Sequence, residues 1–468
     1  MSPRYPLLYQ LNTRELVGET AAPTLDALPE ALFARAAARG FDWIWMLGVW
    51  ATGEAGRREA LAPAMRAAYA RDLPDVRDQD VAGSPFAIAG YTVAATLGGD
   101  AALARLRERL RARGLRLMLD FVPNHVALDH PWVQTHPEYF VAGSDEDLRR
   151  EPGNYVRVQT ARGERILAHG RDPNFPGWTD ALQLNYRHAG LREAMVDQLL
   201  RVADRCDGVR CDMAMLLEPQ VFARTWGDRA RPADGSPPVD APFWPEAIAR
   251  VRRQHPGFLF LAEVYWGLDW QLQQQGFDFT YDKTLYDRLR AGAADPVRAH
   301  LRAEPAFADR CARFLENHDE PRVAAVFPPE QHRAAAALTY LVPGLRFFHE
   351  GQLEGRRARA PIQLTRRRPE RPDPVVGALY DALLSLLARP LLRDGAWHLC
   401  ACRPVDASDA GWRDVIAFRW QLGKQRMTVA VNYGPHPTAC WIDPPDSGPA
   451  VVLAPWAYEV REDLVPTV

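Results

Sequence analysis

Short apolar runs alternate with amphipathic segments along the first three quarters of the chain. The apolar runs have the length of buried strands, and the segments between them repeat leucines or alanines at helical spacing. Between residues 100 and 113, for example, Leu103, Leu106 and Leu110 share one helical face, and Gly114 ends the segment. Eight strands that each precede a helix predict an α/β fold, the (β/α)8 TIM barrel. The predicted strands begin near Leu7, Trp43, Leu115, Val209, Phe258, Phe277, Ala312 and Leu345.

A doubly wound open sheet is the alternative fold for this alternation. Such a sheet usually has a G-x-G-x-x-G turn after one strand and gathers its polar residues at a single switch point. In this chain no predicted strand is followed by that turn, and polar residues follow several strands. The barrel is therefore the better prediction.

Two stretches depart from the strand and helix alternation. Residues 125–182 form one long connection after the third strand, rich in Pro, Gly and aromatic residues, which predicts a small inserted domain. From residue 389 onward, apolar and polar residues alternate between turn residues, as in antiparallel strands. We therefore predict a barrel of residues 1–124 and 183–388, an inserted domain of residues 125–182, and a C-terminal antiparallel, β-sandwich-like domain of residues 389–468.

The composition is that of an ordinary globular protein. The net charge of −2 gives no sign of binding to nucleic acid. Residues 1–6 lack the pattern of a signal peptide, and no apolar run reaches membrane-spanning length, so we expect a cytoplasmic protein without a membrane partner. The six cysteines lack paired spacing and are expected to be free thiols, mostly buried. The pattern favours no particular oligomeric state.

A cation and a carboxylate share one face of the fourth predicted strand. Side chains alternate along a strand, so Arg210 and Asp212 project to the same side. The arginine favours the charged form of Asp212 and lowers its pKa, as a carboxylate nucleophile requires. An isolated Arg–Asp pair is more often structural than catalytic. The residues that follow the other predicted strands therefore decide whether this pair belongs to an active site.

Further polar residues follow other strands, at the end where barrel enzymes carry their active sites. Asp120 to His125 follow the third strand, Glu263 the fifth, and Asn317 to Asp319 the seventh. Glu263 comes directly after an apolar run, where burial raises the pKa of a carboxyl toward that of a general acid. Two carboxyls of different pKa are typical of glycoside hydrolysis. These residues show no metal-ligand spacing, and we predict neither a metal nor a cofactor.

These strand-end segments resemble the signature regions of the α-amylase family of retaining glycoside hydrolases. The resemblance runs from the second strand to the tail, and it is specific because four motifs occur in the right order. The motifs are D-x-V-x-N-H at Asp120–His125, G-x-R-x-D at Gly208–Asp212, the strand-five acid motif at Phe260–Glu263 and F-x-x-N-H-D at Phe314–Asp319. Gln183–Asn185 also resembles the short motif near the end of the family's inserted domain.

The resemblance implies a role for each matching residue. It implies Asp212 as the nucleophile, Glu263 as the acid/base, and Asp319 as a third carboxylate that grips sugar hydroxyls. Four further residues are implied to bind the sugar, namely Tyr91, which stacks on the ring, and His125, Arg210 and His318. The inserted and C-terminal segments correspond to the family's domains B and C. A retaining mechanism predicts carboxyls of Asp212 and Glu263 roughly 5–5.5 Å apart.

Several positions qualify the resemblance. Asn124 matches a position that ligates calcium in some members, but it lacks a dense cluster of oxygen ligands around it, so calcium is not predicted. Ala95 stands where an Asp is common, and Met213 to Met215 stand where starch-degrading members carry Lys-His. In Gly351 to Glu354 the acid of the last motif is displaced by one residue. The last three departures lie at the rim or the acceptor side, so they affect specificity and not the chemistry.

The sequence leaves three hypotheses for the function of the chain. The leading one is hydrolysis of α-glucosidic bonds in short oligosaccharides or disaccharides, small α-glucosides, through a covalent glycosyl-Asp212 intermediate. The alternative passes the same intermediate to a sugar or other hydroxyl, which makes a transglycosylase or an isomerase. The third is a non-catalytic sugar-binding protein on the same barrel. It is disfavoured because Asp212, Glu263 and Asp319 are all present.

Overall fold

The chain folds around a closed barrel of eight parallel strands. The computed structural model describes residues 3–20, 22–406, 408, 410–443 and 449–464. The strand order around the barrel is β1-β14-β13-β12-β11-β10-β5-β2, so the open doubly wound sheet is wrong and the predicted barrel is confirmed. Its strands are β1 (Leu7–Asn12), β2 (Trp43–Leu47), β5 (Arg116–Phe121), β10 (Gly208–Cys211), β11 (Leu259–Ala262), β12 (Phe279–Tyr281), β13 (Cys311–Arg313) and β14 (Leu345–His349).

The barrel strands are apolar on both faces because each face is buried against a different layer. Side chains such as Leu8, Trp45 and Phe347 fill the barrel interior. The alternate side chains, such as Ile44 and Val209, pack outward against the helices. This double burial explains the nearly continuous hydrophobic runs in the sequence.

Helices surround the barrel. In α5, Leu103, Leu106 and Leu110 are buried as their spacing predicts. The barrel helices and their neighbours are α1 (Thr13–Gly18), α2 (Glu30–Ala38), α3 (Glu54–Ala60), α4 (Pro63–Asp72), α5 (Gly99–Arg111), α8 (Ala189–Ala203), α9 (Pro219–Trp226), α10 (Trp244–Gln254), α11 (Asp269–Gln274), α12 (Lys283–Ala291), α13 (Ala294–Leu301), α14 (Pro305–Ala308), α15 (Val323–Val326), α16 (Pro329–Tyr340), α17 (Pro374–Leu387) and α18 (Pro390–Asp394).

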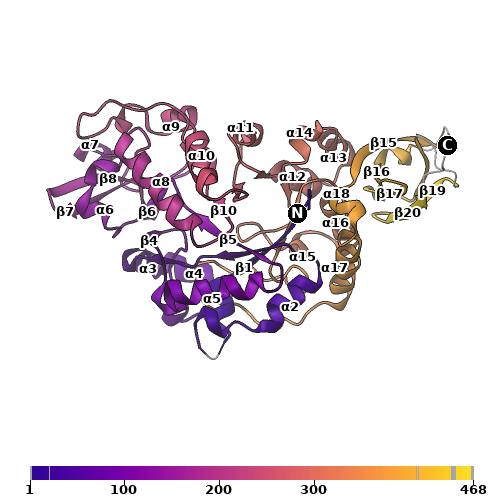
Figure 1. Cartoon of the computed structure of the whole chain (residues 1–468), viewed down its shortest axis with the longest axis horizontal. Helices are drawn as coiled ribbons and strands as arrows, with labels where there is room; N and C mark the ends of the chain where they lie inside the picture. Colours follow the sequence, from indigo (N-terminus) through magenta and orange to yellow (C-terminus); the bar gives the residue numbers. More distant parts are fainter. Residues whose placement is uncertain (1–2, 21, 407, 409, 444–448, 465–468) are drawn as a thin grey trace.

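Two further sheets lie at opposite ends of the long axis of the molecule (Figure 1). The inserted segment forms an antiparallel sheet in the order β6-β9-β8-β7. Its elements are β6 (His125–Ala127), α6 (Trp132–Thr135), α7 (Asp145–Arg150), β7 (Tyr155–Thr160), β8 (Gly163–Gly170) and β9 (Trp178–Gln183). A separate two-stranded sheet, β3 (Trp50–Thr52) and β4 (Ile88–Val93), follows the second barrel strand.

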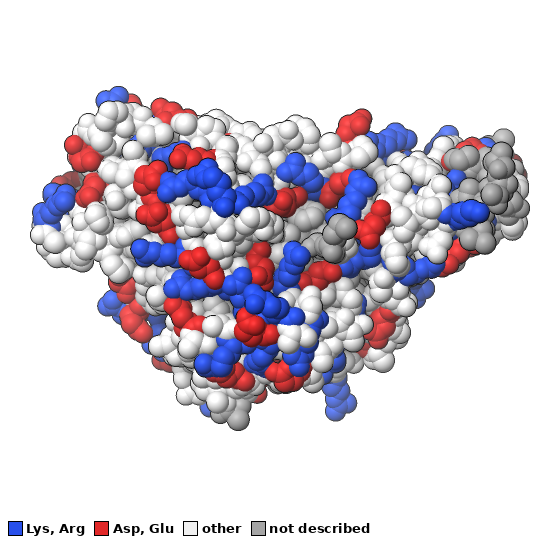
Figure 2. All heavy atoms as spheres, in the orientation of Figure 1, with Lys and Arg blue, Asp and Glu red and all other residues white. Residues whose placement is uncertain are grey.

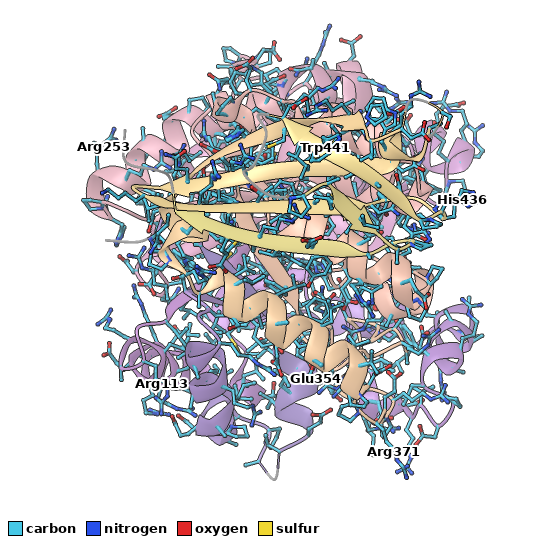
Figure 3. The ribbon with its side chains drawn as sticks, turned by 90° about the vertical axis from the view of Figure 1, so that its right-hand side faces the viewer. Arg113, Arg253, Glu354, Arg371, His436 and Trp441 are labelled. Atoms are coloured by element: carbon cyan, nitrogen blue, oxygen red, sulfur yellow. The ribbon has the colours of Figure 1, made fainter. Side chains whose placement is uncertain are left out.

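The C-terminal sheet is antiparallel, as predicted, in the order β19-β18-β15-β16-β17-β20. Figure 3 views this end of the molecule, with Trp441 labelled on the sheet. Its strands are β15 (Ala396–Pro404), β16 (Val415–Leu422), β17 (Gln425–Asn432), β18 (Thr438–Asp443), β19 (Val451–Leu453) and β20 (Tyr458–Leu464). The domain bounds drawn from the sequence stay predictions, and residues 444–448 and 465–468 of the predicted domain lie outside the described residues.

The surface and the thiols agree with the ordinary composition. Basic and acidic side chains are interspersed over the face that Figure 2 shows. All six cysteines are free, and five of them are buried, as predicted. Among the described residues, no helix has both the length and the apolar character of a membrane span. The cytoplasmic location stays a prediction.

A buried arginine joins the barrel to the segments around its amino-terminal end. Arg346 on β14 is fully buried, and its guanidinium donates to the carbonyl oxygens of Tyr5 at 3.0 Å, Tyr340 at 3.2 Å and Leu392 at 2.9 Å. The rings of Tyr5 and Trp420 lie within 5.7 Å of it. Burial lowers the pKa of Arg346 to about 9. The charge is kept in place by carbonyl dipoles and aromatic faces.

Replacing Arg346 by methionine leaves these three buried carbonyl oxygens without their donor. We expect Arg346→Met to lower the free energy of unfolding by about 3 kcal/mol, measured by urea denaturation followed through tryptophan fluorescence. The matched control is Arg253→Met on the exposed side of α10, which is expected to change it by less than about 0.5 kcal/mol. Equal stability of the two variants would show that the hydrogen bonds of Arg346 do not stabilise the fold.

Candidate active site

Three carboxylates follow barrel strands on one side of the barrel, at the carboxyl ends of β10, β11 and β13. Asp212 comes directly after β10, and its amide donates to the carbonyl of Phe121 at 2.8 Å. Glu263 comes directly after β11, and its amide donates to the carbonyl of Cys211 at 3.0 Å. Asp319 follows β13. Because the parallel ladder continues to Asp212 and Glu263, both side chains leave the barrel at its rim.

One arginine contacts two of these carboxylates. Nη1 of Arg210 lies 2.5 Å from Oδ1 of Asp212, and Nη2 lies 2.7 Å from Oε2 of Glu263. All three side chains are at least 94% buried. The guanidinium presents two parallel donors in a fixed plane, so it fixes the position of both carboxylates at once.

Three aromatic rings enclose the same guanidinium. The ring centroids of Trp45, Phe86 and Tyr281 lie 5.4, 5.1 and 5.9 Å from the Arg210 carbon Cζ. Aromatic faces attract a cation and exclude water from it. The ion pairs of Arg210 therefore lie in surroundings of low polarity, where they are stronger than at the surface.

The two oxygens of Glu263 have different partners. Oε2 forms the ion pair with Arg210 and accepts from the amide of Met213 at 2.7 Å, whereas Oε1 accepts from the hydroxyl of Tyr265 at 2.8 Å. Met213 has a φ of 42°, in the left-handed region that non-glycine residues rarely adopt. The Arg210 cation and the Met213 amide already occupy Oε2, so the proton of the neutral acid belongs on Oε1, beside Tyr265.

The surroundings separate the pKa values of the carboxyls. Burial raises the pKa of Glu263 to about 7; Arg210 opposes this rise, and the charges of Asp212 and Asp319 add to it. Asp319 is 43% exposed at its side chain. Partial burial acts to raise its pKa, but His318 and then Arg210 lower it to about 2. A neutral acid and an ionised carboxylate can therefore coexist near neutral pH.

Asp212 requires a correction to the sequence interpretation. Arg210 lowers its pKa, as predicted, but burial has the larger effect, so the pKa lies above the ordinary value. Asp319 and Asp120 raise it further. Arg210 thus offsets only part of the cost of burying Asp212.

His318 lies beside the third carboxylate. Its Nε2 is 3.0 Å from Oδ2 of Asp319, without the alignment of a hydrogen bond, and its Nδ1 is 2.8 Å from Nε2 of Gln10. The imidazole packs edge-on to Trp45 at 5.6 Å and tilted to Phe86 at 5.4 Å. The structure therefore brings together five of the predicted site residues, namely Asp212, Glu263, Asp319, Arg210 and His318.

Tyr91 lies behind this cluster, not in it. Its side chain is 7% exposed, and its hydroxyl both donates to the carbonyl and accepts from the amide of Val122. Its ring packs against Phe121 and Trp50. Phe86, five residues earlier, is half-buried and contacts Arg210 and His318 instead. The sequence interpretation missed Phe86 because an aromatic residue in a loop carries no polar signal.

His125 is placed at the start of the inserted sheet. It is 5% exposed, its ring lies 4.9 Å from that of Trp178, and burial lowers its pKa to about 4. Asn124 and Gln183 exchange side-chain hydrogen bonds, which ties the third barrel strand to β9. His125 is therefore a neutral imidazole held at the junction of barrel and insert.

Asp120 is a structural carboxylate. Its Oδ1 accepts from Trp45 Nε1 at 3.0 Å and its Oδ2 from the amide of Gly48 at 2.7 Å. It is 1% exposed. These bonds fix the end of β2 and the ring of Trp45, so Asp120 supports the site from below. Among the described residues, no group of three or more His, Cys, Asp or Glu is arranged to hold a metal.

A cavity of about 440 Å3 opens beside Tyr265. Trp266, which is 45% exposed and has a φ of 62°, and Phe175, which is 67% exposed, are among its lining residues. Its other lining residues include Met213, Tyr281, Asp172, Asp269, Lys283 and Asp287. A larger cavity of about 590 Å3 lies at the opposite, amino-terminal face of the barrel, away from the carboxylates. Tyr265, whose hydroxyl donates to Oε1 of Glu263, lines the smaller one, which offers space for a second group on this side of the site.

A closed barrel that gathers carboxylates around an arginine at its carboxyl end is an architecture of barrel enzymes. The family model described as "Alpha amylase, catalytic domain" matches residues 84–360, and the chain belongs to the α-amylase family. This membership agrees with the resemblance of the strand-end motifs.

Relatives in sequence agree with this membership. The α-amylase MalA of Haloarcula japonica is 25% identical over 92% of this chain and 56% of its own length. An α-1,4-glucan:maltose-1-phosphate maltosyltransferase of Burkholderia pseudomallei is 33% identical over 58% of this chain and 21% of its own. The chain thus spans about half or less of these relatives.

Solved structures support the fold. The maltogenic α-amylase AmyB of Thermotoga neapolitana superposes with a TM-score of 0.70 at 19% identity, covering 99% of this chain and 97% of its own. The cyclic α-maltosyl-(1→6)-maltose hydrolase of Arthrobacter globiformis gives 0.70 at 17% identity, covering 99% and 100%. At these identities the likeness shows the fold alone.

The contact between Tyr265 and Glu263 predicts a change in the pKa of the acid. The hydroxyl stabilises the ionised carboxylate, so Tyr265→Phe is expected to raise the pKa of Glu263 from about 7 by about one unit. Carbon-13 NMR of carboxyl-labelled glutamate, assigned with Glu263→Gln, measures it. Tyr69→Phe on α4 is the control and is expected to leave that pKa unchanged. A lower pKa in Tyr265→Phe would show that the hydroxyl does not donate to Oε1.

Proposed function

We propose that this chain is a retaining α-glycoside hydrolase that cleaves α-glucosidic bonds in short oligosaccharides or disaccharides through a covalent glycosyl-Asp212 intermediate. The observation that supports it most directly is that Arg210 contacts both Asp212 and Glu263, while the pKa of Glu263 is raised to about 7 and that of Asp319 lowered to about 2. Carboxyls of separated pKa are what acid-assisted displacement requires.

In the first step, a carboxylate oxygen of Asp212 attacks the anomeric carbon. The glycosidic C–O bond breaks, and the leaving oxygen takes the proton of Glu263. In the second step, ionised Glu263 removes a proton from water, whose oxygen attacks the anomeric carbon and breaks the ester bond to Asp212. The expected separation of roughly 5–5.5 Å between the two carboxyls stays part of this proposal.

Arg210 contacts one charged and one neutral carboxyl group before and after the first step. As the glycosyl ester forms, Asp212 loses its negative charge and Glu263 gains one. The guanidinium contacts both side chains, so it faces one carboxylate and one neutral partner before and after the displacement. Ionised Asp319 stabilises the positive charge that develops on the sugar ring.

The sugar itself is proposed to stack on Phe86. This side chain is half-buried and lies over Arg210 and His318, whereas both the hydroxyl and the ring of Tyr91 are already engaged. We therefore move the stacking role from Tyr91 to Phe86. His125 stays a proposed sugar ligand at the side of the inserted domain.

Transfer to a sugar hydroxyl is the second candidate function. The cavity beside Tyr265 supports it, because the exposed rings of Trp266 and Phe175 offer faces on which an acceptor sugar can stack. Whether water or a sugar reaches the intermediate first decides between the two outcomes. A non-catalytic sugar-binding protein is disfavoured because it needs no raised pKa at Glu263.

The charge around this cavity favours an uncharged leaving group or acceptor. Asp172, Asp269 and Asp287 line it together with one lysine. That lysine, Lys283, lies 2.5 Å from Asp287 and 3.3 Å from Glu320. The surplus of negative charge opposes a phosphate group there. We therefore favour a neutral sugar over the sugar phosphate in the names of the maltosyltransferase relatives.

The mechanism is tested by proton NMR of the purified protein with maltotriose, isomaltose, trehalose and sucrose. We expect one sugar to be consumed with the α-anomer appearing first, and Asp212→Asn to be slower by on the order of 10⁴-fold. Asp228→Asn, at an exposed carboxylate, is the control and is expected to behave like the parent. A β-anomer appearing first would refute the role of Asp212. Disaccharide or oligosaccharide products longer than the substrate would favour transfer.

The stacking proposal separates two aromatic residues. Phe86→Leu is expected to lower kcat/KM about 10-fold, because the sugar loses an aromatic face. Tyr91→Leu is expected to lower the thermal midpoint, since its hydroxyl bonds to Val122 are lost, with KM within about twofold of the parent. Steady-state kinetics and thermal melts of both variants measure this. A larger rise in KM for Tyr91→Leu than for Phe86→Leu would return the stacking role to Tyr91.

A further inference from the structure

A fully buried amide lies inside the barrel directly below the candidate site. Gln10 on β1 is 0% exposed, and its Cα pairs with Trp45 on one side and His349 on the other. Two residues earlier on the same face, Leu8 belongs to the apolar barrel interior. A primary amide in such a place loses its hydration, so its partners must explain it.

The partner of this amide is His318. Nε2 of Gln10 lies 2.8 Å from Nδ1 of the imidazole. An amide nitrogen only donates, so Nδ1 accepts, and the proton of the neutral ring is on Nε2. The carbonyl oxygen of Gln10 has no hydrogen-bond partner among the described residues. The amide is therefore held in the barrel through its donor, at the cost of an unpaired acceptor.

The other ring nitrogen is consistent with the same protonation. Nε2 of His318 lies 3.0 Å from Oδ2 of Asp319, and a carboxyl of ordinary pKa is ionised at neutral pH. A lone pair on Nε2 would face a negative oxygen, whereas an N–H on Nε2 is attracted to it. The contacts at both nitrogens thus favour one tautomer of the neutral ring.

The imidazole also has little freedom to turn. Its side chain is 0% exposed, with Trp45 edge-on at 5.6 Å and Phe86 at 5.4 Å. Trp45 is itself held by Asp120 through a 3.0 Å hydrogen bond. The direction of the Nε2–H bond is therefore fixed by the packing, and its presence by Gln10.

We propose that Gln10 is a positioning residue that fixes His318 as the Nε2–H tautomer. A sugar hydroxyl between His318 and Asp319 then accepts from Nε2–H and donates to Oδ2, so one hydroxyl satisfies both groups. This catalytic consequence rests on the proposed function. The tautomer itself is a property of the free protein, and it can be measured without any substrate.

The first test is nitrogen-15 NMR of ring-labelled histidine in the free protein. His318→Asn identifies the signals of His318 by their loss. We expect the parent to show Nε2–H with a bare Nδ1, and Gln10→Met, which keeps the volume and removes the donor, to show a mixture of tautomers. A parent ring protonated on Nδ1, or a tautomer unchanged in Gln10→Met, overturns the proposal whether or not the protein is active.

Gln10→Glu gives an independent measurement. A carboxylate against Nδ1 draws a proton to that nitrogen while Asp319 retains the one on Nε2, so the ring is expected to become doubly protonated at neutral pH. The nitrogen-15 shifts distinguish this state from either neutral tautomer. A ring that stays neutral in Gln10→Glu would contradict the assigned contact.

The second test is activity on the sugar identified above. We expect Gln10→Met to lower kcat about 10- to 100-fold, with a smaller change in KM, because the hydroxyl contact strengthens as the ring flattens. Gln273→Met, at a buried glutamine of α11 that donates to Thr280, is the matched control for the loss of an interior amide. A parent-like kcat in Gln10→Met, with the tautomer altered, would overturn the positioning role. If no sugar is consumed, the hydrolase proposal fails and the NMR result still decides the tautomer.

Discussion

The ion pairs of Arg210 are the interaction on which the site depends. A guanidinium with no exposed surface is costly to bury, and here two carboxylates and three aromatic rings compensate for its lost hydration. The arrangement is reciprocal, since Asp212 and Glu263 are themselves buried and need the arginine. Removing Arg210 leaves two buried carboxyls without their cation, and removing either carboxylate leaves the guanidinium with only one ion-pair partner, so each group depends on the others.

Around these three groups, residues of the barrel strands hold the site in place, and residues of the loops at the strand ends contact the carboxylates. Asp120 fixes Trp45, which packs against both Arg210 and His318. Met213 adopts a strained left-handed conformation whose amide reaches Glu263. The inner layer of the barrel thus continues into the site without a break. The two appended sheets lie at opposite ends of the molecule (Figure 1), and the inserted domain reaches the cavity beside Tyr265 through Asp172 and Phe175.

The sequence predicts the barrel well because a strand that is buried on both faces needs a continuous run of hydrophobic residues, and such a run can be recognised within a few positions of the chain. The carboxylates were also predictable, since each directly follows a strand. The sequence interpretation missed Phe86, Gln10 and Tyr265, whose roles arise from contacts between distant segments, such as the 308 positions that separate Gln10 and His318. It also overestimated the effect of Arg210 on Asp212, because the depth of burial, which decides the net pKa, is a property of the packed structure.

Only two of the 57 basic residues are lysine, and they lie in different parts of the structure. Lys424 is in the tight turn between β16 and β17, whereas Lys283 lines the cavity beside Tyr265. Arginine guanidinium groups do not react with ordinary amine-directed reagents. Once Lys424 is replaced by arginine, a dye coupled to the one remaining lysine side chain, Lys283, lies at the cavity beside Tyr265 and reports the arrival and departure of whatever occupies that space.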